Sequence, residues 1–240
     1  PTTFGAVYRL DLVSTNHDIS TVKPRRIFFE PSDSTRRYAG VASLYNNQYY
    51  ICRNGPKNEL TRFDRDLAIL LFSKDDELLS PVTTSFSPDG TGLLSLSTMS
   101  AIATQPWNRS VEYVFGQTGD HALYKVQWIQ LVTEGQTTNY VSKFYPSIDG
   151  SIDFLKLNHF ARPAGVTFDP SGNLYVVDAA KDSLYRFSTR GIERYSFGGT
   201  GSGDMQFREP SGIAYFDKTL YVADRGNNRI VRFKLSSDIR

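Results

Sequence analysis

Cysteine, methionine, tryptophan and histidine are all scarce in this chain of 240 residues, which has Cys 1, Met 2, Trp 2 and His 3. A single cysteine, Cys52, excludes an internal disulfide framework and any zinc site made from several cysteines. Its neighbours Tyr50 and Ile51 predict a buried, unreactive thiol on a strand. The three histidines share no spacing that would bring them to one ion, so we expect no catalytic zinc.

Net charge is also small, at +2 from 27 basic and 25 acidic side chains, so no overall field favours nucleic acid. No stretch approaches the roughly 18 apolar residues that a membrane-spanning helix needs. The chain starts at Pro1 with neither an initiator methionine nor a signal sequence. This start predicts a processed, extracytoplasmic protein and makes it a lipoprotein candidate, although a domain cut from a longer chain would look the same.

Aromatic residues, by contrast, are plentiful, with Tyr 14 and Phe 16. They favour pleated sheets over helix surfaces. With 40% hydrophobic and 22% charged residues, the composition is that of a globular chain able to bury its own core. The composition therefore predicts an ordered protein made mainly of strands.

An internal repeat dominates the C-terminal part of the chain. Pro163 and Pro210 begin the two copies and stand 47 positions apart. Each copy contains a short apolar strand, a tight turn, an alternating strand that ends in Asp, a polar loop, and a third strand with an outward arginine. The first copy comprises 163–168, 173–178 and 184–187, with 196–198 as a fourth strand, and the second comprises 210–215, 219–224 and 230–233.

Weaker copies extend the pattern toward the N-terminus. They lie at 40–44, 49–52, 60–63 and 68–72, at 84–90 and 93–96 with a third strand at 123–126, and at 7–10 and 26–29. A four-stranded antiparallel unit that repeats every 40–50 residues or so is typical of a β-propeller blade. We therefore predict one all-β propeller domain over 1–240, with six blades favoured over five and the ring closed by pairing of the N- and C-terminal strands. The segment 98–121 breaks the pattern and is predicted to be an insertion.

The stretches 197–214 and 220–230 resemble the NHL-repeat β-propeller family. Their sequences are FGGTGSGDMQFREPSGIA and LYVADRGNNRI. The resemblance is close over 160–235 and weaker over 40–75. It implies that most residues of the motif hold the fold: glycines 198, 199, 201 and 203 would adopt positive φ, and Asp178 and Asp224 would cap loop N–H groups or pair with Arg225 or Arg229.

Some propellers that this sequence resembles are enzymes. In the peptidyl-hydroxyglycine amidating lyases a metal-binding histidine follows the proline at the start of the innermost strand, where this chain has Ala164 and Ser211. Lactonase-like propellers hold a central calcium ion with Asp, Glu and Asn, but no acidic ligand repeats here with a suitable spacing. We expect no cofactor and no enzymatic activity, and a calcium-dependent lactonase or esterase is the enzyme alternative.

With no enzymatic activity expected, the remaining class of function is the binding of a partner. By analogy with the family, loops that carry several basic residues lie on one face of the disc, where Glu59, Asp182 and Glu209 could instead neutralise them as ordinary ion pairs. We predict a non-catalytic scaffold that binds protein partners in a larger complex, and an RNA-binding domain is a further alternative. Trp107 would anchor a partner through the 98–121 segment. The candidate binding residues are Trp107, Arg53, Arg162, Lys181, Arg208 and Arg225.

Overall fold

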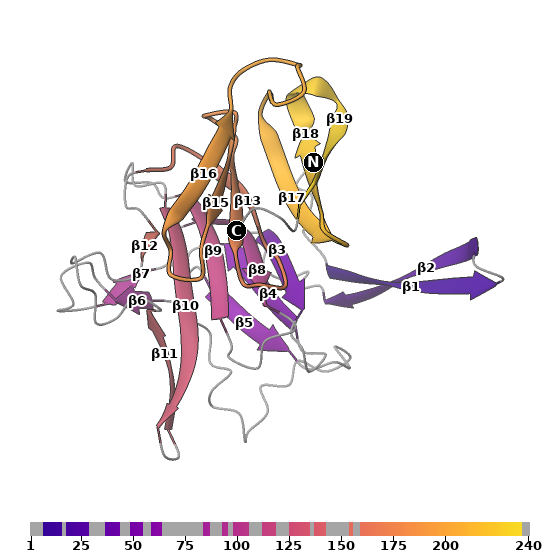
Figure 1. Cartoon of the computed structure of the whole chain (residues 1–240). Coiled ribbons are helices and arrows are strands. Elements are labelled where there is room, and N and C mark those ends of the chain that lie inside the picture. The colour runs from indigo at the N-terminus through magenta and orange to yellow at the C-terminus, as the bar shows by residue number, and fades with distance from the viewer. Residues whose placement is uncertain are drawn as a thin grey trace.

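The protein is built from β-strands, as its composition predicts (Figure 1). The computed structural model describes residues 7–15, 18–28, 37–43, 49–54, 59–63, 84–86, 93–95, 98–105, 112–118, 125–134, 137–142, 154–155 and 159–236. Over these ranges the helical structure is confined to a 3-10 turn, η2 (Arg225–Asn227). In the same ranges, no helix has the length and apolar character needed to span a membrane.

The first repeat forms a four-stranded antiparallel sheet in sequence order. Its strands are β13 (Pro163–Phe168), β14 (Leu174–Asp178), β15 (Ser183–Phe187) and β16 (Glu193–Gly198). The predicted fourth strand at 196–198 is thus confirmed as the end of β16. All five residues of β14 are buried, because sheets pack against both of its faces.

The second repeat forms the sheet β17 (Pro210–Phe216), β18 (Thr219–Asp224) and β19 (Arg229–Lys234). Its shortened turn consists of Asp217 and Lys218, whose φ angles are 43° and 57°. Two consecutive positive φ angles are typical of the type I′ hairpin turn, whose twist matches that of the flanking strands. From its proline to its Asp the second copy is one residue shorter than the first, and this turn accommodates the difference.

Toward the N-terminus, three strands of the predicted unit are confirmed: β3 (Arg37–Ser43), β4 (Tyr49–Asn54) and β5 (Glu59–Phe63). Its predicted fourth strand, 68–72, lies outside the described residues. At the start of the chain, β1 (Val7–Thr15) and β2 (Asp18–Phe28) pair as an antiparallel hairpin. Among the described strands β19 pairs only with β18, so ring closure and blade number stay predictions.

The segment 98–121, which is predicted to be an insertion, contains strands. The strands β8 (Thr98–Thr104) and β9 (Glu112–Thr118) form a sheet with β10 (Lys125–Glu134) and β11 (Thr137–Ser142), and β12 (Phe154–Leu155) also pairs with β10. Within the described ranges, the predicted opening strands of this unit, β6 (Thr84–Phe86) and β7 (Leu93–Ser95), pair only with each other. Alanines at 101 and 103, which have low strand propensity, obscured the strand pattern.

The first strands of the four larger sheets lie side by side in the order β3, β8, β13, β17. Val41, Val166 and Ile213 lie on β3, β13 and β17. The β13–β16 sheet packs against the β8–β11 sheet on one face and against the β17–β19 sheet on the other. This arrangement places the starts of β13 and β17, where the repeats begin, close together.

The hydrophobic core lies between successive sheets. One cluster, which includes Phe160, Val176 and Phe187, fills the space between the β8–β11 and β13–β16 sheets. Another, which includes Val177, Phe207 and Val222, lies between the β13–β16 and β17–β19 sheets. Phe207 is fully buried and comes from the loop that joins those two sheets, so the loop itself is anchored in the core.

Candidate functional site

The carboxylate of Asp178 organises the loops at one end of the β13–β16 sheet. It is fully buried and accepts hydrogen bonds from the backbone N–H groups of Ala161 (2.6 Å), Arg162 (2.9 Å), Ala180 (3.0 Å) and Lys181 (3.1 Å). The prediction that Asp178 caps loop N–H groups is confirmed. This cap fixes the backbone of Arg162 immediately before β13 begins.

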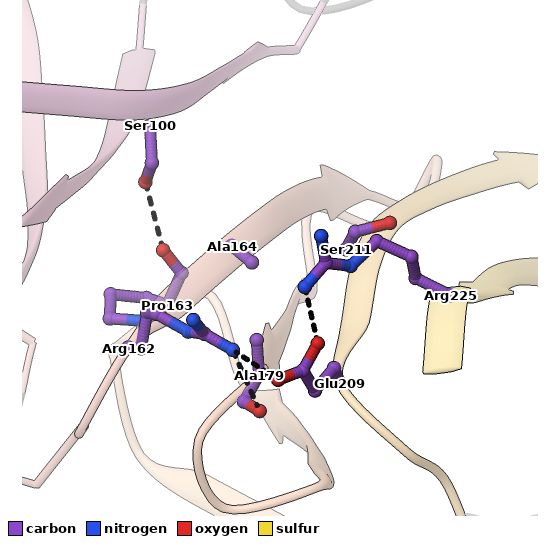
Figure 2. Close-up of a pocket in the computed structure, with 8 residues that line it drawn as sticks. All are labelled: Ser100, Arg162, Pro163, Ala164, Ala179, Glu209, Ser211 and Arg225. Carbon is purple, nitrogen blue, oxygen red and sulfur yellow. Dashed lines mark hydrogen bonds and ion pairs between the residues drawn. The ribbon is translucent and has the colours of Figure 1, made fainter. Parts of the chain in front are cut away.

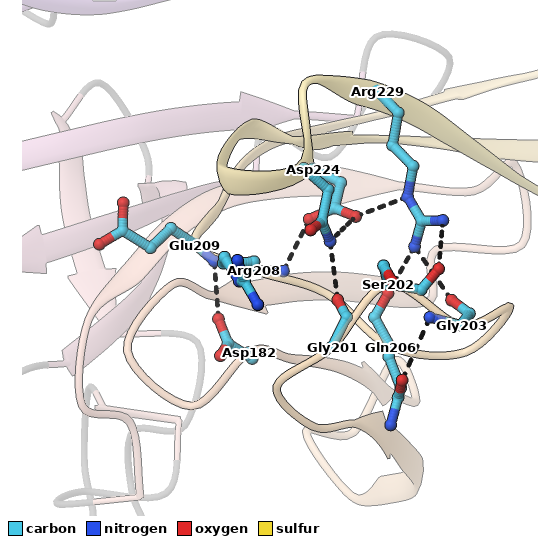
Figure 3. A network of polar contacts seen from close by, with 10 residues as sticks. Asp182, Gly201, Ser202, Gly203, Gln206, Arg208, Glu209, Asp224 and Arg229 are labelled. Carbon is cyan, nitrogen blue, oxygen red and sulfur yellow. Dashed lines mark hydrogen bonds and ion pairs between the residues drawn. The ribbon is translucent and has the colours of Figure 1, made fainter.

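Asp224 has the same role one repeat later (Figure 3). It accepts hydrogen bonds from Arg208 N–H (2.7 Å), Asn227 Nδ2 (2.8 Å) and Arg229 Nε (2.8 Å). Burial alone would raise the pKa of Asp224, but these hydrogen bonds and the charge of Arg229 outweigh it and hold the pKa below its ordinary value. The predicted pairing of Asp224 with Arg229 is confirmed, whereas Arg225 contacts a different carboxylate.

A third carboxylate, Asp182, was weighed from the sequence only as a surface charge. Its Oδ1 accepts the N–H of Glu209 at 2.7 Å, and its Oδ2 accepts the hydroxyl of Thr200 at 2.6 Å. It is buried, so it ties the loop between the sheets to β15. Glu209 has a φ of 48°, an unusual conformation for a residue with a side chain. Asp182 thus helps to hold Glu209 in the strained conformation that sets the position of its side chain.

The glycines of this loop differ from the prediction. Positive φ occurs at Gly198 (141°) and Gly199 (120°) but at neither Gly201 nor Gly203. At Gly201 an added Cβ would meet only the amide end of the Gln206 side chain, which is free to turn aside. Neither a left-handed backbone nor contact with the main chain therefore requires glycine at this position.

Two arginines meet at Glu209 near the starts of β13 and β17 (Figure 2). Arg225 Nη2 pairs with Glu209 Oε2, and Arg162 Nη2 lies 3.8 Å from Glu209 Oε1. The three side chains line a cavity of about 260 Å³ together with Ser100, Pro163, Ala164, Ala179 and Ser211. The Ser100 hydroxyl donates a hydrogen bond to the Pro163 carbonyl at 2.8 Å, which joins β8 to β13.

The charge of this cluster is unbalanced, with two guanidinium groups and one carboxylate. The side chains of Arg162, Glu209 and Arg225 are 43%, 48% and 61% exposed, so water screens their ion pairs. Such exposed ion pairs contribute about 0–1 kcal/mol each to the stability of the fold. A carboxylate of a binding partner could therefore replace Glu209 beside the two arginines at little cost in free energy. The chemistry of the arrangement is that of a binding surface for acidic groups.

Among the described residues, the structure brings two of the candidate binding residues together. Arg162 and Arg225 come together, while the peptide N–H of Arg208 bonds Asp224 and Lys181 Nζ donates to the His159 carbonyl. Arg53 lies in β4, opposite Glu59 of β5. Trp107 lies outside the described residues. Sequence reasoning weighed Glu209 only as a neutralising charge, and its place between two arginines follows from the packing of two sheets.

The surroundings of His159 and Cys52 indicate a structural role for both residues. His159 Nε2 lies 3.4 Å from Glu193 Oε2, and the ring makes edge-on contacts with Phe160 and Tyr185. Cys52 is fully buried, which confirms the predicted burial of this residue, and burial raises the pKa of its thiol. Over the described ranges no three His, Cys, Asp or Glu side chains are grouped so as to hold a metal ion, but the absence of a metal cofactor stays a prediction.

Comparison with known proteins bears out the resemblance seen in the sequence. Residues 207–233 match the NHL repeat, a segment that extends from Phe207 through β17 and β18 into β19. No curated protein sequence matches the chain.

Similar solved structures include a gluconolactonase from Xanthomonas campestris, with 9% identity over 93% of this chain and 63% of that chain, at a TM-score of 0.53. Others are a nidogen/laminin complex (16% identity, 97% and 87% coverage, TM-score 0.46) and regucalcin, a calcium-binding protein from Agrobacterium tumefaciens (12% identity, 85% and 59% coverage, TM-score 0.46). The chain thus spans less than two thirds of the gluconolactonase and regucalcin chains. At these identities the likeness concerns the fold alone.

Proposed function

Because this chain carries an NHL repeat on an all-β fold of antiparallel sheets, we propose that it is a non-catalytic scaffold that binds a protein partner. The contact surface is the basic face, defined here as Arg162, Glu209 and Arg225 with the cavity between them. The observation that carries the proposal is the convergence of two half-exposed arginines from consecutive repeats on a single carboxylate. We further propose an extracytoplasmic location.

A protein partner suits this surface better than a small ligand. The cavity of about 260 Å³ is below the range of roughly 300–1,000 Å³ found for small-molecule sites, and its charges lie at a solvent-exposed rim. Arginine is enriched at the energetic centres of protein interfaces, where its planar group can bind a carboxylate through two hydrogen bonds. The partner that fits therefore presents acidic side chains to Arg162 and Arg225.

The test is quantitative capture of partners by the purified chain from extracts of its native source. We expect the double variant R162A/R225A to capture at most about one tenth of the amount of partner protein that the wild type captures, because both cationic contacts are removed. The matched control is R232A, which removes an exposed arginine on β19 without touching the basic face. Equal capture by the double variant and the wild type would refute the proposal.

The enzyme alternative has its own measurement. Calcium analysis of the purified chain, followed by a panel of lactones and esters, would show bound calcium and turnover if the protein were a hydrolase. We expect neither stoichiometric calcium nor turnover. Calcium-dependent hydrolysis would replace the scaffold proposal with the lactonase one.

A further inference from the structure

A second cavity, of about 360 Å³, lies at the opposite ends of the strands from the basic face. The basic face is at the start of β13, and this cavity is at its other end, where the turn that begins at Asp169 leads into β14. The turn of the next sheet contributes Lys218, and the end of β19 is followed by Leu235, which also lines the cavity. The cavity is therefore a groove between two consecutive sheets, separate from the proposed protein-binding surface.

A row of three side chains crosses the wall of this groove. Tyr175 of β14, Arg186 of β15 and Tyr195 of β16 are paired across the strands, so they lie on the same face of the sheet. The Arg186 guanidinium carbon lies 5.9 Å from the centre of the Tyr175 ring and 5.5 Å from that of Tyr195. These cation–π contacts hold the planar group in place along the groove.

Arg186 has no hydrogen-bond acceptor in the part of the chain that the structure describes. Its Nε is buried and lacks a partner there, and its guanidinium carbon lies over the two tyrosine rings. The nearby carboxylate, Asp169, is occupied: Oδ1 accepts the N–H groups of Ser171 and Asn173 (2.9 Å each), and Oδ2 accepts Asn173 Nδ2 (2.8 Å) and Tyr175 Oη (3.0 Å). No acid of the described chain thus neutralises Arg186 directly.

A guanidinium group that lacks a hydrogen-bond acceptor in a groove is chemically complementary to an anion. A partly buried cation without an acceptor carries a desolvation cost that a bound anion removes. Guanidinium presents a planar fork of N–H donors that matches the two oxygens of a carboxylate or phosphate. Lys218 supplies a second positive charge at the rim. The tyrosines do not oppose an anion, because burial raises the pKa of both Tyr175 and Tyr195 and keeps them protonated at neutral pH.

We propose that this groove binds a small organic anion whose carboxylate or phosphate group accepts hydrogen bonds from Arg186. The apolar body of the anion packs against Tyr195 and Tyr215, which line the same cavity. A volume of about 360 Å³ lies within the range of roughly 300–1,000 Å³ found for small-molecule sites. This site is independent of the basic face and of any partner bound there.

The repeat supplies a matched control for the test. Arg232 occupies on β19 the position that Arg186 occupies on β15, but it is exposed and lines neither cavity. Titration calorimetry would compare the wild type with R186Q, R186K and R232Q, using benzoate and phenyl phosphate as anionic probes. Phenol tests the aromatic body without the charge, and inorganic phosphate tests the charge without the body.

We expect benzoate or phenyl phosphate to bind the wild type and R232Q equally, and phenol and inorganic phosphate to bind at least tenfold more weakly. R186Q should weaken binding at least tenfold. R186K should do the same although it keeps the charge, because lysine has no planar fork, and its melting temperature shows whether the fold is intact. The proposal is overturned if neither anionic probe binds, if phenol binds as well as benzoate, or if R186K and R232Q behave alike.

Discussion

At the scale of single residues, the buried carboxylate of Asp224 makes the stability of this fold depend on pH. Its pKa is lower in the folded protein than the ordinary value of 3.8. Between the folded and the unfolded pKa, the folded state therefore binds fewer protons than the unfolded state. The stabilisation that Asp224 provides is complete above the unfolded pKa. It is lost as the pH falls through the folded pKa.

We therefore predict that D224N lowers the free energy of unfolding by about 1–3 kcal/mol at pH 7, because the hydrogen bonds to Arg208 N–H and Arg229 lose their charged acceptor. The difference between D224N and the wild type should shrink as the pH falls below about 4, because the unfolded wild-type chain takes up a proton on Asp224 there while the folded chain does so only at lower pH. Urea unfolding at pH 7, 5 and 3 measures both effects. D204N is the control, since Asp204 is exposed in the same loop. A difference that stays constant with pH would contradict the role assigned to the charge.

At the scale of elements, the approach of β13 to β17 depends on one glycine of a repeated pair. A Cβ at Gly165 would lie 2.9 Å from Gly212 Cα and 3.0 Å from Ile213 N, both backbone atoms that cannot turn aside. A Cβ at Gly212 would meet only the Ala223 side chain, at 3.9 Å. The two glycines occupy the same position of the repeat, but only Gly165 is needed for the sheets to meet.

We predict that G165A destabilises the protein by about 1–3 kcal/mol through overpacking, while G212A changes stability by less than about 0.5 kcal/mol. Thermal and urea unfolding of the two variants and the wild type would measure the difference. Because both substitutions add the same methyl group, the change in unfolded-chain entropy cancels in the comparison. Equal destabilisation by the two variants would show that β13 and β17 are not in direct contact.

At the scale of the whole molecule, the ring predicted from the repeat has a measurable size. A closed propeller of 240 residues is expected to have the radius of gyration of a compact domain, roughly 18 Å. Small-angle X-ray scattering of the monomeric chain measures this value directly. An open arc of sheets would give a clearly larger radius and would contradict closure by the N- and C-terminal strands.

Much of the fold could be predicted from local sequence patterns. The Pro-to-Asp repeat located β13, β14, β17 and β18, because strand alternation and turn residues act over short distances along the chain. The caps at Asp178 and Asp224 were predictable for the same reason. The strand β8 was missed because its small residues acquire a strand conformation from the sheets beside it, not from their own propensity.

The candidate sites, in contrast, depend on packing between sheets. The sequence alone determined that Arg186 and Arg232 are equivalent arginines on third strands, and it named Arg162 and Arg225 as basic loop residues. Only the tertiary structure decided that Arg186 lies between two tyrosines in a groove while Arg232 is exposed, since β16 covers one side of β15 and the next sheet forms the other wall. It also decided that Arg162 and Arg225 share Glu209, because residues from separate repeats meet only when the innermost strands pack side by side.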